Sequence, residues 1–245
     1  MNFKTIKREF ESFTLNIRDY FSDKNTKILF NKRNVIKVVD YNNQHYIVKS
    51  FKIPHLINKI SYTLFRDSKA KRSYIYSLQL ESFAPKPISY IEFKKFGLLY
   101  DSYFISEQFE YDYTIREPLL DNNFIYRDDI FKSFANFTFQ LHEKNIFHKD
   151  YSPGNILIKQ HTNGYEFKIV DVNRMTFKVL SLEARLENFS QLWAKDIDLE
   201  IIVKEYSKLI DMDSQIMIKK ALKYSQNLKD RKNLKKRLKG KKVVD

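Results

Sequence analysis

Apolar and polar positions alternate along the first half of the chain. The alternation is clearest between residues 27 and 51, where polar turns at residues 31–34 and 40–43 separate three short segments. In the last segment, Val48 would lie on one face of an extended strand and Lys49 on the other. Because short turns join antiparallel neighbours, this region predicts a meander of three antiparallel strands.

The next elements are separated by residues that break regular structure. Residues 68–82 predict a helix, which ends where the proline-containing stretch 83–87 interrupts the chain. Residues 88–93 and 98–109 then predict a second antiparallel hairpin, with its turn at residues 94–97.

Helical periodicity dominates the second half of the chain. Residues 127–145 predict a helix with a core-facing stripe. Residues 182–193 and 200–224 predict two further helices, and the short apolar segments 156–158 and 167–170 predict a hairpin between the helical regions. The apolar positions of the stripe recur at i, i+4, i+7 and i+11: Ile130, Phe134, Phe137 and Leu141.

Polar side chains flank that last hairpin. His148, Asp150 and Asn155 precede its first strand, and Asp171 comes after its second. A Pro-Gly turn at residues 153–154 lies between Asp150 and Asn155, and it can fold both side chains toward one cleft. Phosphoryl transfer from a nucleotide needs this set, because one carboxylate accepts a hydroxyl proton while an amide and a second carboxylate hold magnesium. Each Asp alone is consistent with a turn or a strand cap, and the combination favours phosphoryl-transfer chemistry.

A family resemblance rests on these residues. The run His-Lys-Asp-Tyr-Ser-Pro-Gly-Asn-Ile-Leu-Ile at residues 148–158, with Asp171, resembles the catalytic and metal-binding loops of the protein-kinase-like superfamily. This version of the loop is similar to that of the bacterial lipopolysaccharide kinases, which phosphorylate Kdo or heptose in the inner core. The similarity spans residues 26–195. Further segments that look like this subgroup are residues 49–54, 56–60, 68–74 and 114–117.

The resemblance implies an α+β, two-lobed protein-kinase-like fold. A small lobe of antiparallel sheet with a helix would comprise residues 1–107, and a larger, mainly helical lobe would comprise residues 108–228. Residues 229–245 would form a basic C-terminal tail.

The resemblance also implies ATP and Mg²⁺ as cofactors. Asp150 would be the catalytic base, and Asn155 and Asp171 would hold the metal ion. Lys49, at the end of Tyr-Ile-Val-Lys, would contact the α- and β-phosphates of the nucleotide. Glu107 lies in the segment that would bind adenine through backbone groups.

Other polar residues near these positions have less specific roles. In this fold His148 packs under the catalytic loop, so it is expected to be structural. For Lys149 the alternative to a phosphate or substrate contact is an ordinary surface lysine, and for Arg174 it is an internal salt bridge. The candidate substrate or phosphate contacts are Lys149, Arg174, Lys32 and Arg33.

The chain departs from protein kinases at two places. The loop after the first strand contains no glycine, so its phosphate contacts would come from Lys32, Arg33 or backbone amides. In addition, the acids between Lys49 and residue 85 are Asp67 and Glu81, and neither is at an obvious position to pair with Lys49. A missing partner for Lys49 is also compatible with a pseudokinase.

The region after Asp171 indicates which class of molecule would accept the phosphoryl group. It contains no Ala-Pro-Glu sequence, and the segment 175–183 is too short for a peptide-docking activation segment. This favours a small-molecule or glycan hydroxyl over a protein substrate.

Charge and composition narrow the classes of partner that the protein could bind. Twelve Lys or Arg and two Asp lie between Lys219 and Asp245. Residues 219–245 therefore carry most of the formal charge of +14. Such a block suggests an anionic membrane surface, a glycolipid or nucleic acid, of which the last has only charge in its favour. The chain has no cysteine, and residues 1–24 lack the apolar core of a signal peptide and predict either a strand or a helix.

These features predict an ATP-dependent kinase that phosphorylates a sugar hydroxyl of the lipopolysaccharide inner core, with Kdo on a lipid A precursor as the acceptor. It would work at the cytoplasmic face of the inner membrane of a Gram-negative bacterium, as a peripheral protein. The alternatives are a phosphotransferase acting on a soluble alcohol or sugar, and a catalytically inactive scaffold that binds nucleotide or membrane.

Overall fold

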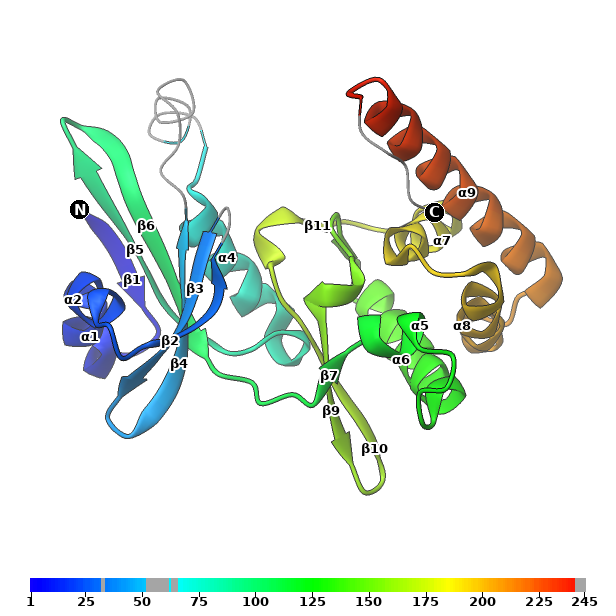
Figure 1. The fold of residues 1–245 in the computed structure, drawn as a ribbon, viewed down its shortest axis with the longest axis horizontal. Coiled ribbons are helices and arrows are strands. Elements are labelled where there is room, and N and C mark those ends of the chain that lie inside the picture. The colour runs from blue at the N-terminus through cyan, green and yellow to red at the C-terminus, as the bar shows by residue number, and fades with distance from the viewer. Residues whose placement is uncertain (32–33, 52–61, 63–65, 241–245) are drawn as a thin grey trace. The chain divides into compact units, whose positions relative to one another are not determined.

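The computed structural model describes residues 1–31, 34–51, 62 and 66–240 (Figure 1). Its contacts divide the chain into two compact units. The N-terminal unit comprises Met1–Glu110 and the short segment Asp171–Asn173. The C-terminal unit comprises Tyr111–Val170 and the chain from Arg174 onward. The chain therefore enters the N-terminal unit a second time at Asp171.

A six-stranded antiparallel sheet is the framework of the N-terminal unit, with the order β1-β5-β6-β4-β3-β2. The predicted meander and the predicted hairpin are confirmed and belong to this one sheet. Asn42 and Asn43, both with positive φ, form the tight turn between β3 and β4, a conformation that asparagine adopts more readily than most residues. The strands are β1 (Asn2–Thr5), β2 (Lys27–Asn31), β3 (Asn34–Tyr41), β4 (Gln44–Phe51), β5 (Pro87–Lys95) and β6 (Leu98–Glu107).

Helices pack on both faces of this sheet. On one face, Phe13 and Ile17 are fully buried against Val39, Val48 and other strand residues. Burial of each such side chain contributes about 1.5–3 kcal/mol to folding. Residues 1–24, for which the sequence predicted either a strand or a helix, thus contain both. Among the described residues of this unit, the helices are α1 (Glu11–Leu15), α2 (Ile17–Ser22) and α4 (Lys69–Leu80), with the 3-10 turns Arg8–Phe10 and Glu81–Phe83.

The other face of the sheet carries Lys49. Phe51, two residues along the same strand, packs with Ala70 and Tyr74 of α4. The side chain of Ser68 caps α4 by accepting a hydrogen bond from the backbone N–H of Lys71 at 3.1 Å. The helix predicted over residues 68–82 is therefore present and covers part of the face that carries Lys49.

The C-terminal unit combines helices with two small antiparallel sheets, β10-β9-β7 and β11-β8. The predicted hairpin is present as β9 and β10, joined at Gly164. The strands are β7 (Tyr113–Thr114), β8 (Ile146–His148), β9 (Ile156–His161), β10 (Gly164–Ile169) and β11 (Met175–Phe177). The helices are α5 (Arg116–Leu120), α6 (Arg127–Glu143), α7 (Leu182–Phe189), α8 (Asp196–Leu209) and α9 (Ser214–Arg237), with the 3-10 turns Pro153–Asn155, Val172–Arg174 (shared with the other unit) and Ser190–Leu192.

Helix α6 forms the centre of this unit. Phe134 stacks on Tyr151 with 5.7 Å between the ring centroids, and Thr138 shares a 2.9 Å hydrogen bond with the Tyr151 hydroxyl. Tyr151 is fully buried, so the residue after Asp150 anchors the loop to the core. Of the predicted stripe, Phe137 is only half-buried and stacks on Phe167 at the edge of the core.

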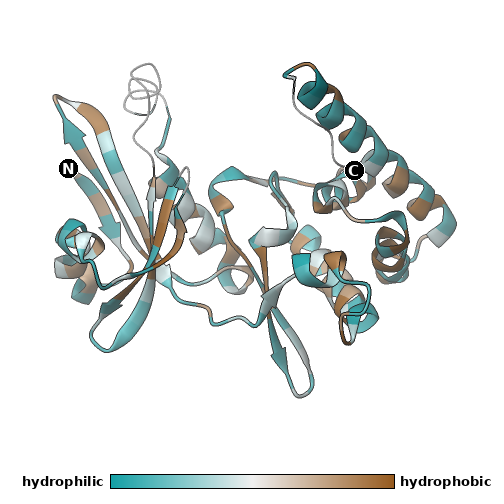
Figure 2. Ribbon diagram, in the orientation of Figure 1, coloured by the Kyte–Doolittle hydropathy of each residue, from teal (hydrophilic) through white to brown (hydrophobic). Residues whose placement is uncertain are grey.

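The last helices differ from the prediction. The helix expected over residues 200–224 is two helices, because Asp211 adopts a positive φ and Asp213 caps α9 through a 2.8 Å hydrogen bond from the Ile216 backbone N–H. Helix α9 also runs unbroken through residues 228 and 229, where a separate tail was expected to begin. Figure 2 shows that its C-terminal half is mostly hydrophilic with isolated apolar positions.

Candidate active site

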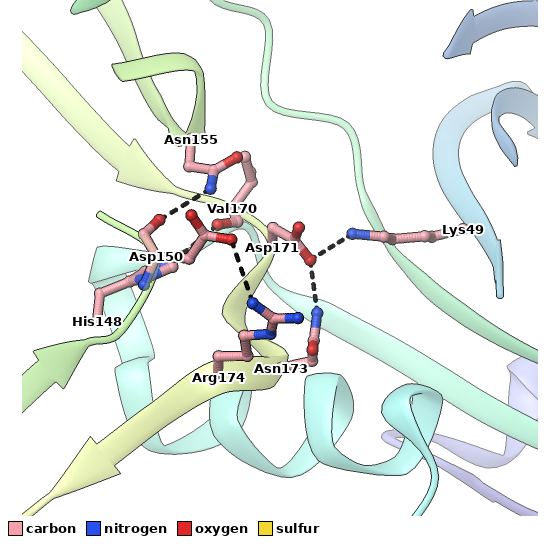
Figure 3. Close-up of polar contacts among 8 residues, drawn as sticks. All are labelled: Lys49, His148, Asp150, Asn155, Val170, Asp171, Asn173 and Arg174. Carbon is pink, nitrogen blue, oxygen red and sulfur yellow. Dashed lines mark hydrogen bonds and ion pairs between the residues drawn. The ribbon is translucent and has the colours of Figure 1, made fainter. Parts of the chain in front are cut away.

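The loop between β8 and β9 carries Asp150 and Asn155. The Asn155 side-chain amide donates a 2.9 Å hydrogen bond to the Asp150 carbonyl, which closes the loop on itself (Figure 3). This bond uses the nitrogen of the amide and leaves the oxygen available as an acceptor. The Pro153–Asn155 segment forms a 3-10 turn, so the proline and glycine bend the chain as their sequence predicted.

His148 holds this loop from below. Its Nδ1 accepts a 3.0 Å hydrogen bond from the Asp150 backbone N–H, so the ring proton is on Nε2, which lies 3.1 Å from the Val170 carbonyl. The imidazole is fully buried. It therefore joins the loop to the last residue before Asp171, and its geometry is that of a structural residue.

A buried polar network supports the same loop from the helices. The Asn188 side chain donates a 3.0 Å hydrogen bond to the His148 carbonyl. His142 lies 3.2 Å from Asn188 through Nε2 and 2.9 Å from the Tyr206 hydroxyl through Nδ1. Burial lowers the pKa of His142 to about 4, so the ring is neutral near pH 7. Asn188 and His142 were not predicted from the sequence, because only the fold brings them to the loop.

The Asp150 carboxylate is accessible. Its side chain is 41% exposed, and Arg174 lies 3.9 Å away at the limit of an ion pair, itself 60% exposed. The backbone N–H of Lys149 donates to the Arg174 carbonyl at 3.0 Å, while the Lys149 residue is exposed. An ionised carboxylate with this exposure is able to accept a proton from a hydroxyl, and two basic residues lie beside it.

Within the N-terminal unit, Lys49 and Asp171 form an ion pair. Lys49 Nζ lies 2.6 Å from Asp171 Oδ1, and the lysine side chain is only 11% exposed. The Asn173 side chain donates to the same carboxylate oxygen (Figure 3). Asp171 adopts a left-handed backbone with φ of 57°, which asparagine and aspartate tolerate better than other residues with a side chain. Asn173 is a further residue of the site that was not predicted from the sequence.

Helix α4 supplies no carboxylate to Lys49. Its twelve residues include no Asp or Glu, and its buried face consists of Ala70, Ser73, Tyr74, Ser77 and Leu80. Asp67 pairs with Lys71 at 2.7 Å. Among the described residues, the ion pair of Lys49 is therefore with Asp171, and the helix glutamate of protein kinases has no equivalent in α4.

The strand face around Lys49 is apolar and incompletely covered. Lys49 lies opposite Ile36, and Ile47 lies opposite Val38, and these three apolar side chains are half-buried. Val38 also lines a cavity of about 380 Å³ within this unit. Such a surface beside a lysine suits a ligand with a flat apolar part and phosphates.

The adenine-binding segment is only partly available for hydrogen bonding. The Glu107 carboxylate pairs with Lys86 at 2.9 Å, and the Glu107 backbone N–H donates to the Lys86 carbonyl. The backbone N–H of Gln108 donates to the His45 carbonyl at 3.3 Å. Adenine contacts from Glu107 would have to use its other backbone group. Lys32 and Arg33 lie outside the described residues.

The donor chemistry fits magnesium. In the described part of the chain, no group of three or more His, Cys, Asp or Glu is placed to hold a metal ion. Mg²⁺ is usually bound through one or two protein oxygen ligands, with the remaining positions taken by water and phosphate oxygens. The Asn155 amide oxygen and the Asp171 carboxylate are ligands of that kind.

The fold and these residues define a kinase-like phosphotransferase. The sequence model of the lipopolysaccharide kinase (Kdo/WaaP) family matches residues 32–212. The chain belongs to this family, whose kinase activity implies the use of ATP. A solved structure described as "WaaP in complex with acyl carrier protein" is similar with a TM-score of 0.57 and 11% identity, covering 93% of this chain and 99% of that one. No curated protein matches the sequence. The two-lobed α+β kinase-like fold is confirmed.

Proposed function

We propose that this protein transfers the γ-phosphoryl group of ATP to a sugar hydroxyl of the lipopolysaccharide inner core, with Kdo on a lipid A precursor as the acceptor. The observation that carries the proposal is the loop in which Asn155 closes on the Asp150 carbonyl while the Asp150 carboxylate stays 41% exposed. The family supports the general reaction, and the choice of Kdo over heptose is ours.

The proposed step uses few protein groups. The acceptor oxygen bonds to the γ-phosphorus, the bond to the β,γ-bridging oxygen breaks, and the hydroxyl proton passes to Asp150. Lys49 would contact the α- and β-phosphates. Asn155 and Asp171 would hold Mg²⁺, whose positive charge would offset the charge of the phosphates when the ion is bound. The protein contributes mainly position and charge.

The short connection after β11 supports a sugar acceptor. Strand β11 ends at Phe177 and helix α7 begins at Leu182, so four residues connect them. This connection is too short to form a docking platform for a peptide. Lys149 and Arg174 lie beside Asp150 and supply positive charge for an anionic acceptor.

The surface of α9 supports attachment to an anionic membrane, where a glycolipid acceptor would lie. Lys232 and Lys236 lie over the ring of Trp193, 5.4 and 5.6 Å from its centroid. On the same helix, Leu234 and Leu238 are 59% and 79% exposed. None of the helices in the described residues is both long and apolar enough to cross a bilayer. We propose that the protein works at the cytoplasmic face of the inner membrane of a Gram-negative bacterium, held by reversible surface contacts.

Mass spectrometry of the acceptor tests the proposed reaction. The full-length protein, ATP and Mg²⁺ are incubated with Kdo–lipid A, and in parallel with soluble sugars and alcohols. We expect one added phosphate on the Kdo-containing acceptor, and none with Asp150→Asn. Faster transfer to a soluble alcohol would instead support a small-molecule phosphotransferase.

A second candidate function is a catalytically inactive scaffold. The absence of a carboxylate from α4 favours it, because active protein kinases pair the strand lysine with a helix glutamate. ATP binding without transfer to any acceptor would support the scaffold and contradict the proposed kinase activity.

A further inference from the structure

Arg116 is held next to the catalytic loop by its backbone. The preceding residue, Ile115, donates its N–H to the carbonyl of Ile156 at 3.0 Å, and Thr114 pairs with Leu157 in the β7–β9 ladder. Strand β9 begins directly after Asn155. The position of Arg116 is therefore fixed by strand pairing and does not depend on a loop.

The Arg116 guanidinium lies on the backbone of Gly154. A Cβ placed on Gly154 would lie 2.3 Å from Nη2 and 3.0 Å from Cζ of Arg116. The φ of Gly154 lies outside the left-handed region, so its backbone conformation does not require glycine. Glycine here provides the space that the guanidinium occupies, within the turn between Asp150 and Asn155.

The charge of Arg116 has no protein partner in the described part of the chain. The neighbouring carboxylate, Glu117, accepts hydrogen bonds from the N–H and hydroxyl of Thr114 at 2.8 and 2.6 Å. By contrast, Arg127 pairs with Asp198 and Arg185 pairs with Glu143 in the same unit. Arg116 is also exposed to solvent.

We propose that Arg116 binds a carboxylate of the acceptor and so determines specificity for an acidic sugar. A guanidinium presents two parallel N–H donors that match the two oxygens of a carboxylate, and one on a fixed backbone would orient the acceptor hydroxyl toward Asp150. Arg174 lies 3.9 Å from the Asp150 carboxylate, whereas Arg116 pairs with no carboxylate among the described residues, so Arg116 is the better placed of the two to hold the acceptor. This inference rests on the proposed function and narrows its substrate to carboxylate-bearing sugars.

Three variants test the role of Arg116. Arg116→Gln removes the charge, and Gly154→Ala keeps the charge but introduces a methyl group where Nη2 now lies. Because that neighbour is the end of a flexible side chain, the alanine variant is expected to fold and to displace the guanidinium. Arg8→Gln, at an exposed position of the 3-10 turn Arg8–Phe10, is the matched control for loss of one positive charge.

Steady-state kinetics are measured with a delipidated Kdo oligosaccharide and with the same oligosaccharide after reduction of its carboxylate to an alcohol. Loss of a charged hydrogen bond corresponds to about a 10- to 100-fold effect. We expect Arg116→Gln to raise KM for the carboxylate acceptor by that factor and leave KM for ATP unchanged. Gly154→Ala should give a smaller shift in the same direction, and Arg8→Gln none. With the reduced acceptor, wild type and Arg116→Gln should be equally poor.

Calorimetric titration with Kdo monosaccharide separates this inference from the proposed reaction, because it needs no turnover. Binding that weakens by about 10-fold or more in Arg116→Gln supports the inference even if no transfer is detected. Equal binding by wild type and Arg116→Gln, or the absence of binding by wild type, overturns it. An increase in KM for ATP alone would also overturn it, because it would assign Arg116 to the nucleotide.

Discussion

Lys49 and Asp171 are 122 positions apart in the sequence, yet Nζ of Lys49 lies 2.6 Å from Oδ1 of Asp171. The lysine side chain is nearly buried and the aspartate is one-third exposed. The carboxylate that would bind the metal ion therefore neutralises the lysine that would bind the phosphates. A bound nucleotide and metal ion would replace this ion pair with their own contacts to Lys49 and Asp171, and α4 supplies no glutamate to Lys49.

Replacing Lys49 with methionine removes this charge and keeps much of the apolar length. We expect Lys49→Met to weaken ATP binding or slow turnover by about 10-fold or more, because a charged hydrogen bond to phosphate is lost. Lys4→Met, at an exposed position of β1, is the control for a strand lysine. Kinetics at low ATP measure the effect, and thermal unfolding checks that both variants fold. Unchanged kinetics for Lys49→Met would show that phosphate binding lies elsewhere.

Asp150 is expected to act as the general base. Asp150→Asn should lower kcat by about 10²- to 10⁴-fold with little change in stability, because the carboxylate is partly exposed and its backbone contacts are retained. Asp128→Asn, an exposed residue in the first turn of α6, is the matched control. Single-turnover transfer measured by mass spectrometry avoids product-release effects. Full activity in Asp150→Asn would contradict the assignment.

Asp171 is expected to bind the metal. Asp171→Asn preserves the side-chain size and a residue type that tolerates the left-handed backbone of φ 57°, so the fold should survive. Activity should fall to background at all Mg²⁺ concentrations, because an amide is a poorer ligand than a carboxylate. Asp171→Ala should in addition lower the melting temperature, since alanine is strained at this φ. Mg²⁺-dependent activity in Asp171→Asn equal to wild type would place the metal ligand elsewhere.

The His142 network predicts acid sensitivity. Burial lowers the pKa of His142 to about 4 in the folded protein, against about 6.5 for an unperturbed histidine. Between these values the unfolded chain binds a proton that the folded chain excludes, so the free energy of unfolding decreases as the pH falls from 6.5 toward 4. The contribution of neutral His142 to the free energy of unfolding is on the order of 3 kcal/mol. It is fully present above pH 6.5 and is lost as the pH falls to about 4.

Denaturant unfolding at pH 7.0 and 5.0 measures this contribution. We expect wild type to lose stability over this range, and His142→Gln to lose less, because glutamine does not titrate. His142→Gln will be less stable at pH 7 because the contacts with Asn188 and Tyr206 change. The informative quantity is therefore the difference between the two pH values for each protein. Identical pH dependence in both would exclude His142 as its source.

The basic half of α9 is expected to bind anionic membranes. Each Lys or Arg close to such a surface contributes about 1 kcal/mol, and the effect is screened by salt. Neutralising four exposed basic residues should release the protein from vesicles containing anionic lipid and leave transfer to a soluble acceptor intact. The four substitutions are Arg231→Gln, Lys235→Gln, Arg237→Gln and Lys239→Gln.

Co-sedimentation with vesicles at low and high salt measures this binding. A control variant loses four positive charges from exposed lysines of the N-terminal unit: Lys4→Gln, Lys24→Gln, Lys94→Gln and Lys95→Gln. Equal vesicle binding by both variants would exclude α9 as the attachment surface. Tighter binding of the wild type to nucleic acid than to vesicles would also contradict the membrane proposal.

The parts of the site that are close together in sequence were predictable. Asp150 and Asn155 lie in one loop whose Pro-Gly turn indicates its bend, and alternation of apolar residues placed Lys49 on a strand face. Short-range patterns of this kind depend on backbone geometry alone.

Contacts between distant segments could not be predicted. Asn188 lies 40 positions from His148, and no periodicity marks it as the residue that supports the loop. The contact of Arg116 with Gly154 is similar, because the turn signal gave no sign that the glycine also provides space for a distant side chain. The break before α9 depends on Asp213 as a cap, a signal that helical periodicity obscures.

The hydrogen bond from the Asp150 backbone to His148 restricts where the imidazole ring can carry its proton. Nδ1 of His148 accepts this bond, so it must carry a lone pair while the loop is in place. Protonating the ring would put a hydrogen on Nδ1 against the N–H of Asp150 and push the loop away. The buried ring can therefore hold the loop only as the neutral tautomer with its proton on Nε2.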